Sequence, residues 1–284
     1  MMALKDWPRR PGDMLCAALI CVILAGGNCL SAQTTEPVRP KPPASVAGVE
    51  VDLELVLLAD ATGSIDPAEI LFQRQGYASA INDPAVLSAI AGTLTGRIAI
   101  TYVEWGAQTS QDVVVPWRVI DGPSAAATFG TELMTAPRRA SGRNAIGAAL
   151  LFGRDLIEGN DLDGWRRIID FSADSAGNFN GPAIADARDA VLAAGITING
   201  LPVLCRSCPS GRADTSDLET AFQDQIIGGP GSFVVTAESD ATFAEAVRRK
   251  LILEIAGFHG GRVVASGAAI SHDISGNNPA AGGP

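Results

Sequence analysis

The sequence predicts an α/β protein with a doubly wound, mostly parallel, Rossmann-like sheet and one antiparallel edge strand. Short apolar runs typical of buried strands alternate along the chain with amphipathic stretches typical of helices. Hydrophobic residues make up 47% of the 284 residues but aromatic residues only 5%, so the core consists mainly of aliphatic side chains, as in helix-covered parallel sheets. Two of the apolar runs end on a carboxylate, Asp60 and Asp174, as expected where strands bring polar side chains to one edge.

The predicted elements follow one another in chain order. Strands are predicted at 51–59, 97–105, 112–117, 166–173, 196–204 and 232–236, and helices at 67–81, 123–135, 145–158, 182–194, 215–227 and 240–256. The run 112–117 follows 97–105 after a short connection, which predicts a hairpin with 112–117 at the antiparallel edge. Pro116 is tolerated there because an edge strand leaves one row of its amide groups unpaired.

The first 32 residues predict an export signal. Lys5, Arg9 and Arg10 form a basic start, an apolar run extends from Met14 to Gly26, and small residues precede Gln33. The apolar run is short for a membrane span, although a retained anchor is the alternative. We therefore expect a secreted or periplasmic protein with no stable membrane span after processing. The predicted organisation is a signal peptide (1–32), a Pro-rich linker (33–49), one folded domain (50–256) and a flexible tail (257–284).

Two cysteines, Cys205 and Cys208, remain once the leader is removed. In an oxidising compartment the pair predicts a small disulfide that fixes the loop after a strand. Thiol redox chemistry and half of a zinc site are the alternatives.

The residues Asp60, Thr62 and Ser64 follow a buried strand at every second position. One carboxylate and two hydroxyls offer only oxygen ligands, which suit Mg²⁺, Mn²⁺ or Ca²⁺ better than zinc. The alternative is that Ser64 or Asp66 caps the helix that begins near Pro67. A second acidic loop, Asp174 with the polar residues after it, and a glycine loop around Asn144 favour the metal site.

These three elements, in this order, resemble the metal-ion-dependent adhesion site (MIDAS) of the von Willebrand factor A (vWA) superfamily. The pattern there is a D-x-S-x-S run, a Thr in a loop before a helix, and an Asp after a later strand. Asp60, Thr62 and Ser64 match the first element, Asn144 falls on the Thr, and Asp174 falls on the last Asp. The resemblance covers residues 50–256 and is closest to a secreted bacterial branch without an established function.

The resemblance implies a vWA-like fold in which the five matching residues hold Mg²⁺, or Mn²⁺ or Ca²⁺, as the cofactor. Thr62 replaces the usual Ser, and Ser175 follows Asp174 where Gly is common. In the family an acidic group of a partner completes the metal shell, so the implied partner is a protein that presents an acidic side chain. Arg143 and Asn178 are candidate partner contacts.

Composition limits the other function classes. The net charge of −10 disfavours nucleic acid and anionic membranes as partners. The predicted domain has no histidine, so Ser-His-Asp and Cys-His catalysis lack their base. The predicted function is therefore a secreted, metal-dependent binding module and not an enzyme.

The alternative is a Mg²⁺-dependent, phosphatase-like hydrolase with Asp60 as nucleophile, although Thr62 then stands where a general acid is needed. Two further features allow two readings each. The basic residues Arg138, Arg139 and Arg143 either attract an acidic partner or are simply solvated or paired with nearby carboxylates, and Trp105 belongs either to the core or to a contact surface.

Overall fold

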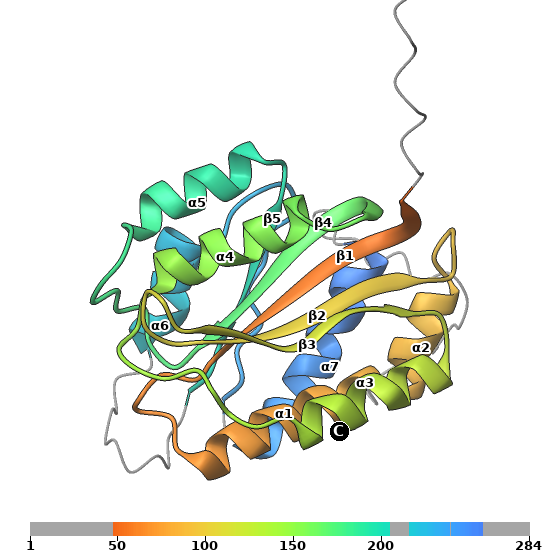
Figure 1. Ribbon diagram of the computed structural model, residues 1–284, viewed down its shortest axis with the longest axis horizontal. Helices are drawn as coiled ribbons and strands as arrows, with labels where there is room; N and C mark the ends of the chain where they lie inside the picture. The colour runs from red at the N-terminus through yellow and green to blue at the C-terminus, as the bar shows by residue number, and fades with distance from the viewer. Residues whose placement is uncertain (1–47, 205–215, 239, 258–284) are drawn as a thin grey trace, which may run out of the picture. The chain divides into compact units, whose positions relative to one another are not determined.

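The structure, a computed structural model, describes residues 48–204, 216–238 and 240–257. These form a sheet of five strands in the order β3-β2-β1-β4-β5, with helices on both faces (Figure 1). Only β3 runs antiparallel to its neighbour, which confirms the predicted fold class. The strands are β1 (Val49–Asp60), β2 (Ile98–Trp105), β3 (Gln111–Ile120), β4 (Leu162–Ala173) and β5 (Thr197–Pro202).

The helices form two layers with different partners. Side chains of α1, α2, α3 and α7 pack into one apolar core, and those of α4, α5, α6 and η1 contribute to the core on the other face (Figure 1). Their bounds are α1 (Pro67–Ile81), α2 (Pro84–Ala91), α3 (Pro123–Thr135), α4 (Ile146–Glu158), α5 (Ile184–Ala193), α6 (Ser216–Ala221), the π-helix η1 (Phe222–Ile226) and α7 (Asp240–Ala256).

The strand order reverses at one point of the sheet. From β1 the chain passes to β2 and β3 on one side, and it returns to β4 on the other side of β1. The order therefore reverses between β1 and β4, and ligands of such sheets bind beyond the carboxyl ends of the strands at that point. Asp60 ends β1 and Asp174 follows β4, so both predicted carboxylates lie there.

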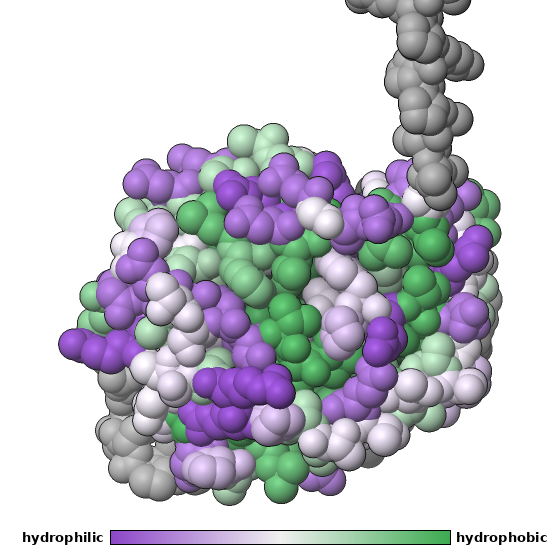
Figure 2. Space-filling view, in the orientation of Figure 1, coloured by the Kyte–Doolittle hydropathy of each residue, from purple (hydrophilic) through white to green (hydrophobic). Residues whose placement is uncertain are grey.

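The predicted hairpin is confirmed at the β3 edge. β2 pairs with β3, and Pro116 falls beside a register shift on the outer strand. Trp105 is fully buried and stacks on Phe171 with ring centroids 5.1 Å apart, so it belongs to the core. On the surface between α3 and α4, along the β3 edge, Figure 2 shows gathered hydrophobic side chains, and the partly buried Val113 and Trp117 belong to this edge.

Two predicted elements differ from the structure, and one helix was not predicted. Residues 232–236 form no strand. They make isolated bridges from Val234 to Gly200 and, just beyond, from Ala237 to Val203, because Pro202 between these two partners has no amide hydrogen with which to continue the ladder. The helix predicted at 215–227 is divided into α6 and η1. The helix α2 was not predicted, although Asp83 caps it and Pro84 occupies its first turn, which are recognisable start signals.

Several predictions lie outside the described residues: the export signal, nearly all of the linker and the tail, and the Cys205–Cys208 disulfide. Within the described part of the chain, no helix is long and apolar enough to cross a membrane.

Candidate metal centre

The first predicted loop leaves β1 with its carboxylate inside and its last hydroxyl at the surface. Asp60 is 2% exposed, and its Oδ1 accepts the amide of Thr62 at 2.8 Å, which closes a tight turn. Thr62 is buried and Ser64 is exposed, and their hydroxyl oxygens lie 3.2 Å apart. The helix-cap alternative is settled by Asp66, whose Oδ1 accepts the amides of Ala68 and Glu69. Ser64 is therefore not needed as the cap of α1.

The glycine loop before α4 is joined to the first loop. The Gly63 amide donates to the Gly142 carbonyl at 2.8 Å, and Gly142 has a φ of +99°, which favours glycine. Gly106, after β2, lies so close that an added Cβ would be 2.2 Å from the Ser141 carbonyl oxygen. Below the two loops, Ala61 and Ala140 are buried in one small apolar cluster. The backbone thus brings Ser64 and Asn144 to one surface recess.

The third loop, after β4, meets both of the others. Asn144 is 6% exposed, and its Nδ2 donates to the hydroxyl of Ser175 at 2.9 Å, which leaves Oδ1 as the amide atom for a cation. Asp60 and Asp174 line the same hollow. The structure therefore brings the three predicted loops together at the carboxyl end of the sheet.

The electrostatics of Asp60 fit a bound cation. Its Oδ2 is buried and accepts no hydrogen bond from the described residues. Burial, and then the charge of Asp174, raise the pKa of Asp60 to about 7. A bound positive ion compensates a carboxylate whose ionisation is disfavoured by burial and by a neighbouring negative charge.

The available donors also limit the kind of ion. Among the described residues no group of three or more His, Cys, Asp or Glu side chains is placed to hold a metal. Only two of the five predicted ligands are carboxylates, and the others are hydroxyl and amide oxygens. Such a set fits a hard divalent cation that keeps some of its coordination for water or for a partner's oxygen.

Arg138 has a role that the sequence did not reveal. Its guanidinium donates to the carbonyls of Ala61 (2.8 Å), Thr62 (3.0 Å) and Ile65 (2.8 Å), and to that of Ala140 at 3.3 Å. The side chain therefore holds the first loop against the second. Gln73, also missed, donates from Nε2 to the Asp60 carbonyl at 3.3 Å. Neither residue belongs to a motif, because each acts on backbone atoms far away in sequence.

The other predicted contact residues have different environments. Arg139 is exposed and lies 3.4 Å from Asp112, whereas the guanidinium of Arg143 lies over the ring of Phe179, 4.5 Å from its centroid. The amide of Asn178 is used inside the protein: its Oδ1 accepts from the Gly147 amide at 3.4 Å, and its Nδ2 donates to the Pro182 carbonyl at 2.9 Å. Of these residues, Arg143 remains exposed beside the site.

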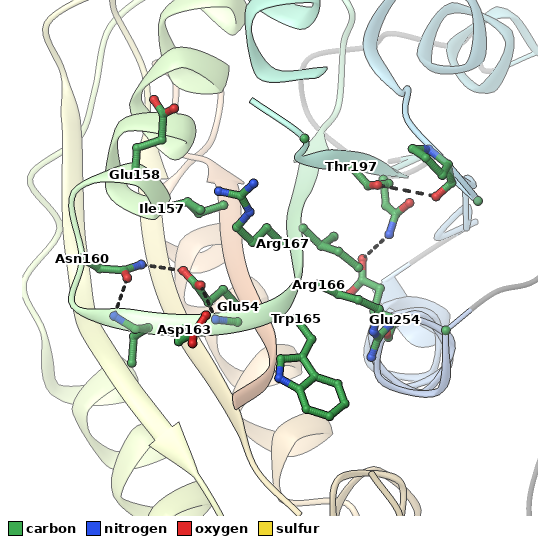
Figure 3. Close-up of a pocket in the computed structure, with 18 of the residues that line it drawn as sticks. Glu54, Ile157, Glu158, Asn160, Asp163, Trp165, Arg166, Arg167, Thr197 and Glu254 are labelled. Atoms are coloured by element: carbon green, nitrogen blue, oxygen red, sulfur yellow. Dashed lines mark hydrogen bonds between the residues drawn. The ribbon is translucent and has the colours of Figure 1, made fainter. Parts of the chain in front are cut away.

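A larger hollow of about 1160 Å³ lies at the opposite, amino end of the strands (Figure 3). Glu54 lines it and accepts hydrogen bonds from Asn160 Nδ2 at 2.6 Å and the Gly164 amide at 2.9 Å. Arg166 donates to the carbonyls of Glu254 and Ile255 at the end of α7. These charged groups are held by the protein itself, and the sequence did not predict the hollow.

Residues 50–259 match the model of a family described as "Protein of unknown function (DUF1194)". The chain belongs to the DUF1194 family. No curated protein matches this DUF1194 chain.

Solved structures similar to this DUF1194 chain share its fold. The pilus adhesin SpaC from Lactobacillus rhamnosus GG has a TM-score of 0.52 at 11% identity, over 73% of this chain and 30% of SpaC. A von Willebrand factor type A structure from Catenulispora acidiphila has a TM-score of 0.51 at 15% identity, over 73% and 43%. Proximal thread matrix protein 1 from the mussel byssus, with a zinc-occupied MIDAS motif, has a TM-score of 0.52 at 16% identity, over 74% and 49%.

This DUF1194 chain thus spans less than half the length of each of these proteins. At such identities the likeness shows the fold alone, which is that of vWA domains.

Proposed function

We propose that this protein is a secreted binding module that holds a divalent cation at Asp60, Thr62, Ser64, Asn144 and Asp174. The ion is Mg²⁺, or Mn²⁺ or Ca²⁺, and it grips an acidic group of a partner protein. Adhesin and MIDAS-bearing structures among the similar folds are in line with this role.

One observation carries the proposal: the buried Oδ2 of Asp60, which accepts no hydrogen bond from the described residues, lies beside a second carboxylate. An unpartnered buried carboxylate oxygen is costly, and a cation compensates it better than a water molecule does. The exposed hydroxyl of Ser64 places one edge of the site at the surface, so an oxygen from outside has access to the ion.

The hydrolase alternative gains no supporting observation. The Thr62 hydroxyl contacts that of Ser64 and is too weak an acid to protonate a leaving group at neutral pH. Lys250 is the only lysine among the described residues. It is buried between Asp170 and Glu254, and its Nζ lies 2.9 Å from Asp170 Oδ1.

Titration calorimetry and thermal unfolding test the cation. After dialysis against EDTA, the protein is titrated with MgCl₂, MnCl₂ and CaCl₂, and we expect binding heat together with a rise in melting temperature. An ion at one hundred times its Kd stabilises the fold by about 2.7 kcal/mol. Asp60→Asn removes one ligand charge at almost constant shape and should abolish both signals.

Asp66→Asn is the matched control, because Asn also caps helices and Asp66 lies in the same loop outside the site. It should leave metal binding intact. Absence of binding heat and of any thermal shift with all three ions would reject the site, as would equal losses in the two variants.

A further inference from the structure

The recess beside the candidate metal centre is built from all three loops. It has a volume of about 310 Å³ and is lined by Gly63, Ser64, Gly142, Arg143, Asn144 and Phe179. Two of these residues, Ser64 and Asn144, are proposed metal ligands. Gly142 contributes only backbone to the recess, and an added Cβ would lie 2.8 Å from that of Ala107. A partner group that reaches the ion through this recess would therefore contact the remaining lining side chains, Arg143 and Phe179.

One wall is a fixed pair of side chains. The Phe179 amide donates to the Asn144 carbonyl at 2.9 Å, and the ring packs against Gly177, where an added Cβ would be 3.0 Å from the ring. The guanidinium of Arg143 lies over the same ring, 4.5 Å from its centroid. Stacking on an aromatic face limits the movement of an arginine without neutralising its charge.

Arg143 differs from its two neighbours in what it binds. Arg138 donates to backbone carbonyls, and Arg139 pairs with Asp112. None of the salt bridges between described residues includes Arg143. Its charge is therefore presented at the rim of the recess.

The recess offers two separate positive groups to a partner, the ion and the Arg143 guanidinium. A divalent ion balances the carboxylates of Asp60 and Asp174, and Arg143 then adds one positive charge beside the ion. The protein as a whole has a net charge of −10, so the recess is a local positive site on an acidic surface. A single partner carboxylate on the metal would balance this charge, but it would leave the N–H donors of the Arg143 guanidinium without a carboxylate partner.

We propose that the recess binds an acidic stretch of a partner polypeptide that carries two carboxylates. One carboxylate completes the metal shell, and the second pairs with the Arg143 guanidinium above the Phe179 ring. The inference rests on the proposed metal-dependent function, and it assigns to Arg143 and Phe179 the selection of the partner sequence.

Synthetic peptides test this pairing on the Mg²⁺-saturated protein. Each glycine-flanked peptide has an Asp followed by a Glu directly, after one glycine or after two, and each has an analogue with Gln in place of Glu. Binding is measured by NMR chemical-shift titration at low ionic strength. We expect the Glu peptide of at least one spacing to bind roughly three- to fivefold more tightly than its Gln analogue.

Arg143→Gln should equalise the two peptides and leave the Kd for Mg²⁺ unchanged, whereas Arg139→Gln should preserve the preference. If no spacing distinguishes Glu from Gln, if neither peptide binds, or if Arg143→Gln retains the preference, the recess does not select a second carboxylate. Equal, EDTA-sensitive binding of both peptides would overturn this inference alone. Absence of Mg²⁺ binding in calorimetry would remove the proposed function as well.

Discussion

Arg138→Ala removes the side chain that holds the Asp60 loop in place. The guanidinium donates to the carbonyls of Ala61, Thr62 and Ile65 at 2.8–3.0 Å. All three residues are buried, so their carbonyls depend on protein partners. The substitution therefore affects the loop that positions two of the proposed ligands, although Arg138 itself is not expected to touch the metal.

The expected cost follows from these bonds. A hydrogen bond from a charged donor contributes about 1.5–3 kcal/mol, and the contributions of one side chain do not simply add. Arg138 is partly exposed, so water replaces some of what is lost. We expect a total loss of about 2–4 kcal/mol, divided between the free energy of unfolding and the free energy of metal binding.

Two measurements separate these contributions. Thermal unfolding in EDTA reports the loss in the metal-free protein, where each kcal/mol lowers the melting temperature by roughly 2–4 °C. Calorimetry with Mg²⁺ reports the remainder as a weaker Kd. Arg139→Ala is the adjacent control, since its exposed contact with Asp112 contributes less than about 1 kcal/mol. If the two variants behave alike in both assays, Arg138 does not position the loop.

Four further predictions concern other parts of the chain. Ser175→Gly alone should weaken Mg²⁺ binding, whereas Asn144→Thr with Ser175→Gly should recover it; a double-mutant cycle should give a coupling of about 1 kcal/mol, and additive effects would contradict the Asn144–Ser175 contact. Burial raises the pKa of Asp170 to about 7, against the opposing charge of Lys250, so the folded protein keeps a proton that the unfolded chain releases. Stability to urea in EDTA should therefore fall as the pH rises from about 4 to 7, and less steeply in Asp170→Asn; equal slopes would count against this origin. Gly106→Ala should cost about 1–3 kcal/mol because its Cβ meets the Ser141 carbonyl, while Gly122→Ala, with nothing within 4 Å, should cost much less. Mass spectrometry of exported protein should show Gln33 as the first residue and no free thiol at Cys205 or Cys208, and an alkylatable Cys205 would contradict the disulfide.

The parts of the fold that the sequence predicted are those set by short-range patterns. The apolar run before Asp60 and the Ile168–Ala173 run before Asp174 place two carboxylates at strand ends, and the alternation of elements makes those ends share an edge. The antiparallel edge was predictable because 112–117 follows β2 so closely. From these elements alone, the position of the candidate site within the sheet could be stated.

What the sequence could not predict depends on contacts between distant residues. The guanidinium of Arg138 reaches carbonyls 73 to 77 residues earlier in the chain, and no local pattern encodes that direction. The segment 232–236 has strand-like composition, but the neighbouring Pro202 has no amide hydrogen to continue the ladder, and only bridges form. Composition indicates which secondary structure a segment favours, whereas contacts with distant residues decide which structure it adopts.

The pair Asn144 and Ser175 shows how such a distant contact changes the interpretation of a motif. Each residue, taken alone, departs from the vWA pattern and suggests a weakened metal site. In the structure the two departures meet, 31 residues apart in sequence, through a hydrogen bond of 2.9 Å. The Ser175 hydroxyl takes one end of the Asn144 amide and leaves its carbonyl oxygen as the neutral donor that the family's Thr would supply. A chain with only one of these two residues would lack either the Ser175 hydroxyl that holds the amide or the Asn144 amide that is held. The two departures are therefore better understood as one change in the way that a neutral oxygen would be positioned for the proposed metal.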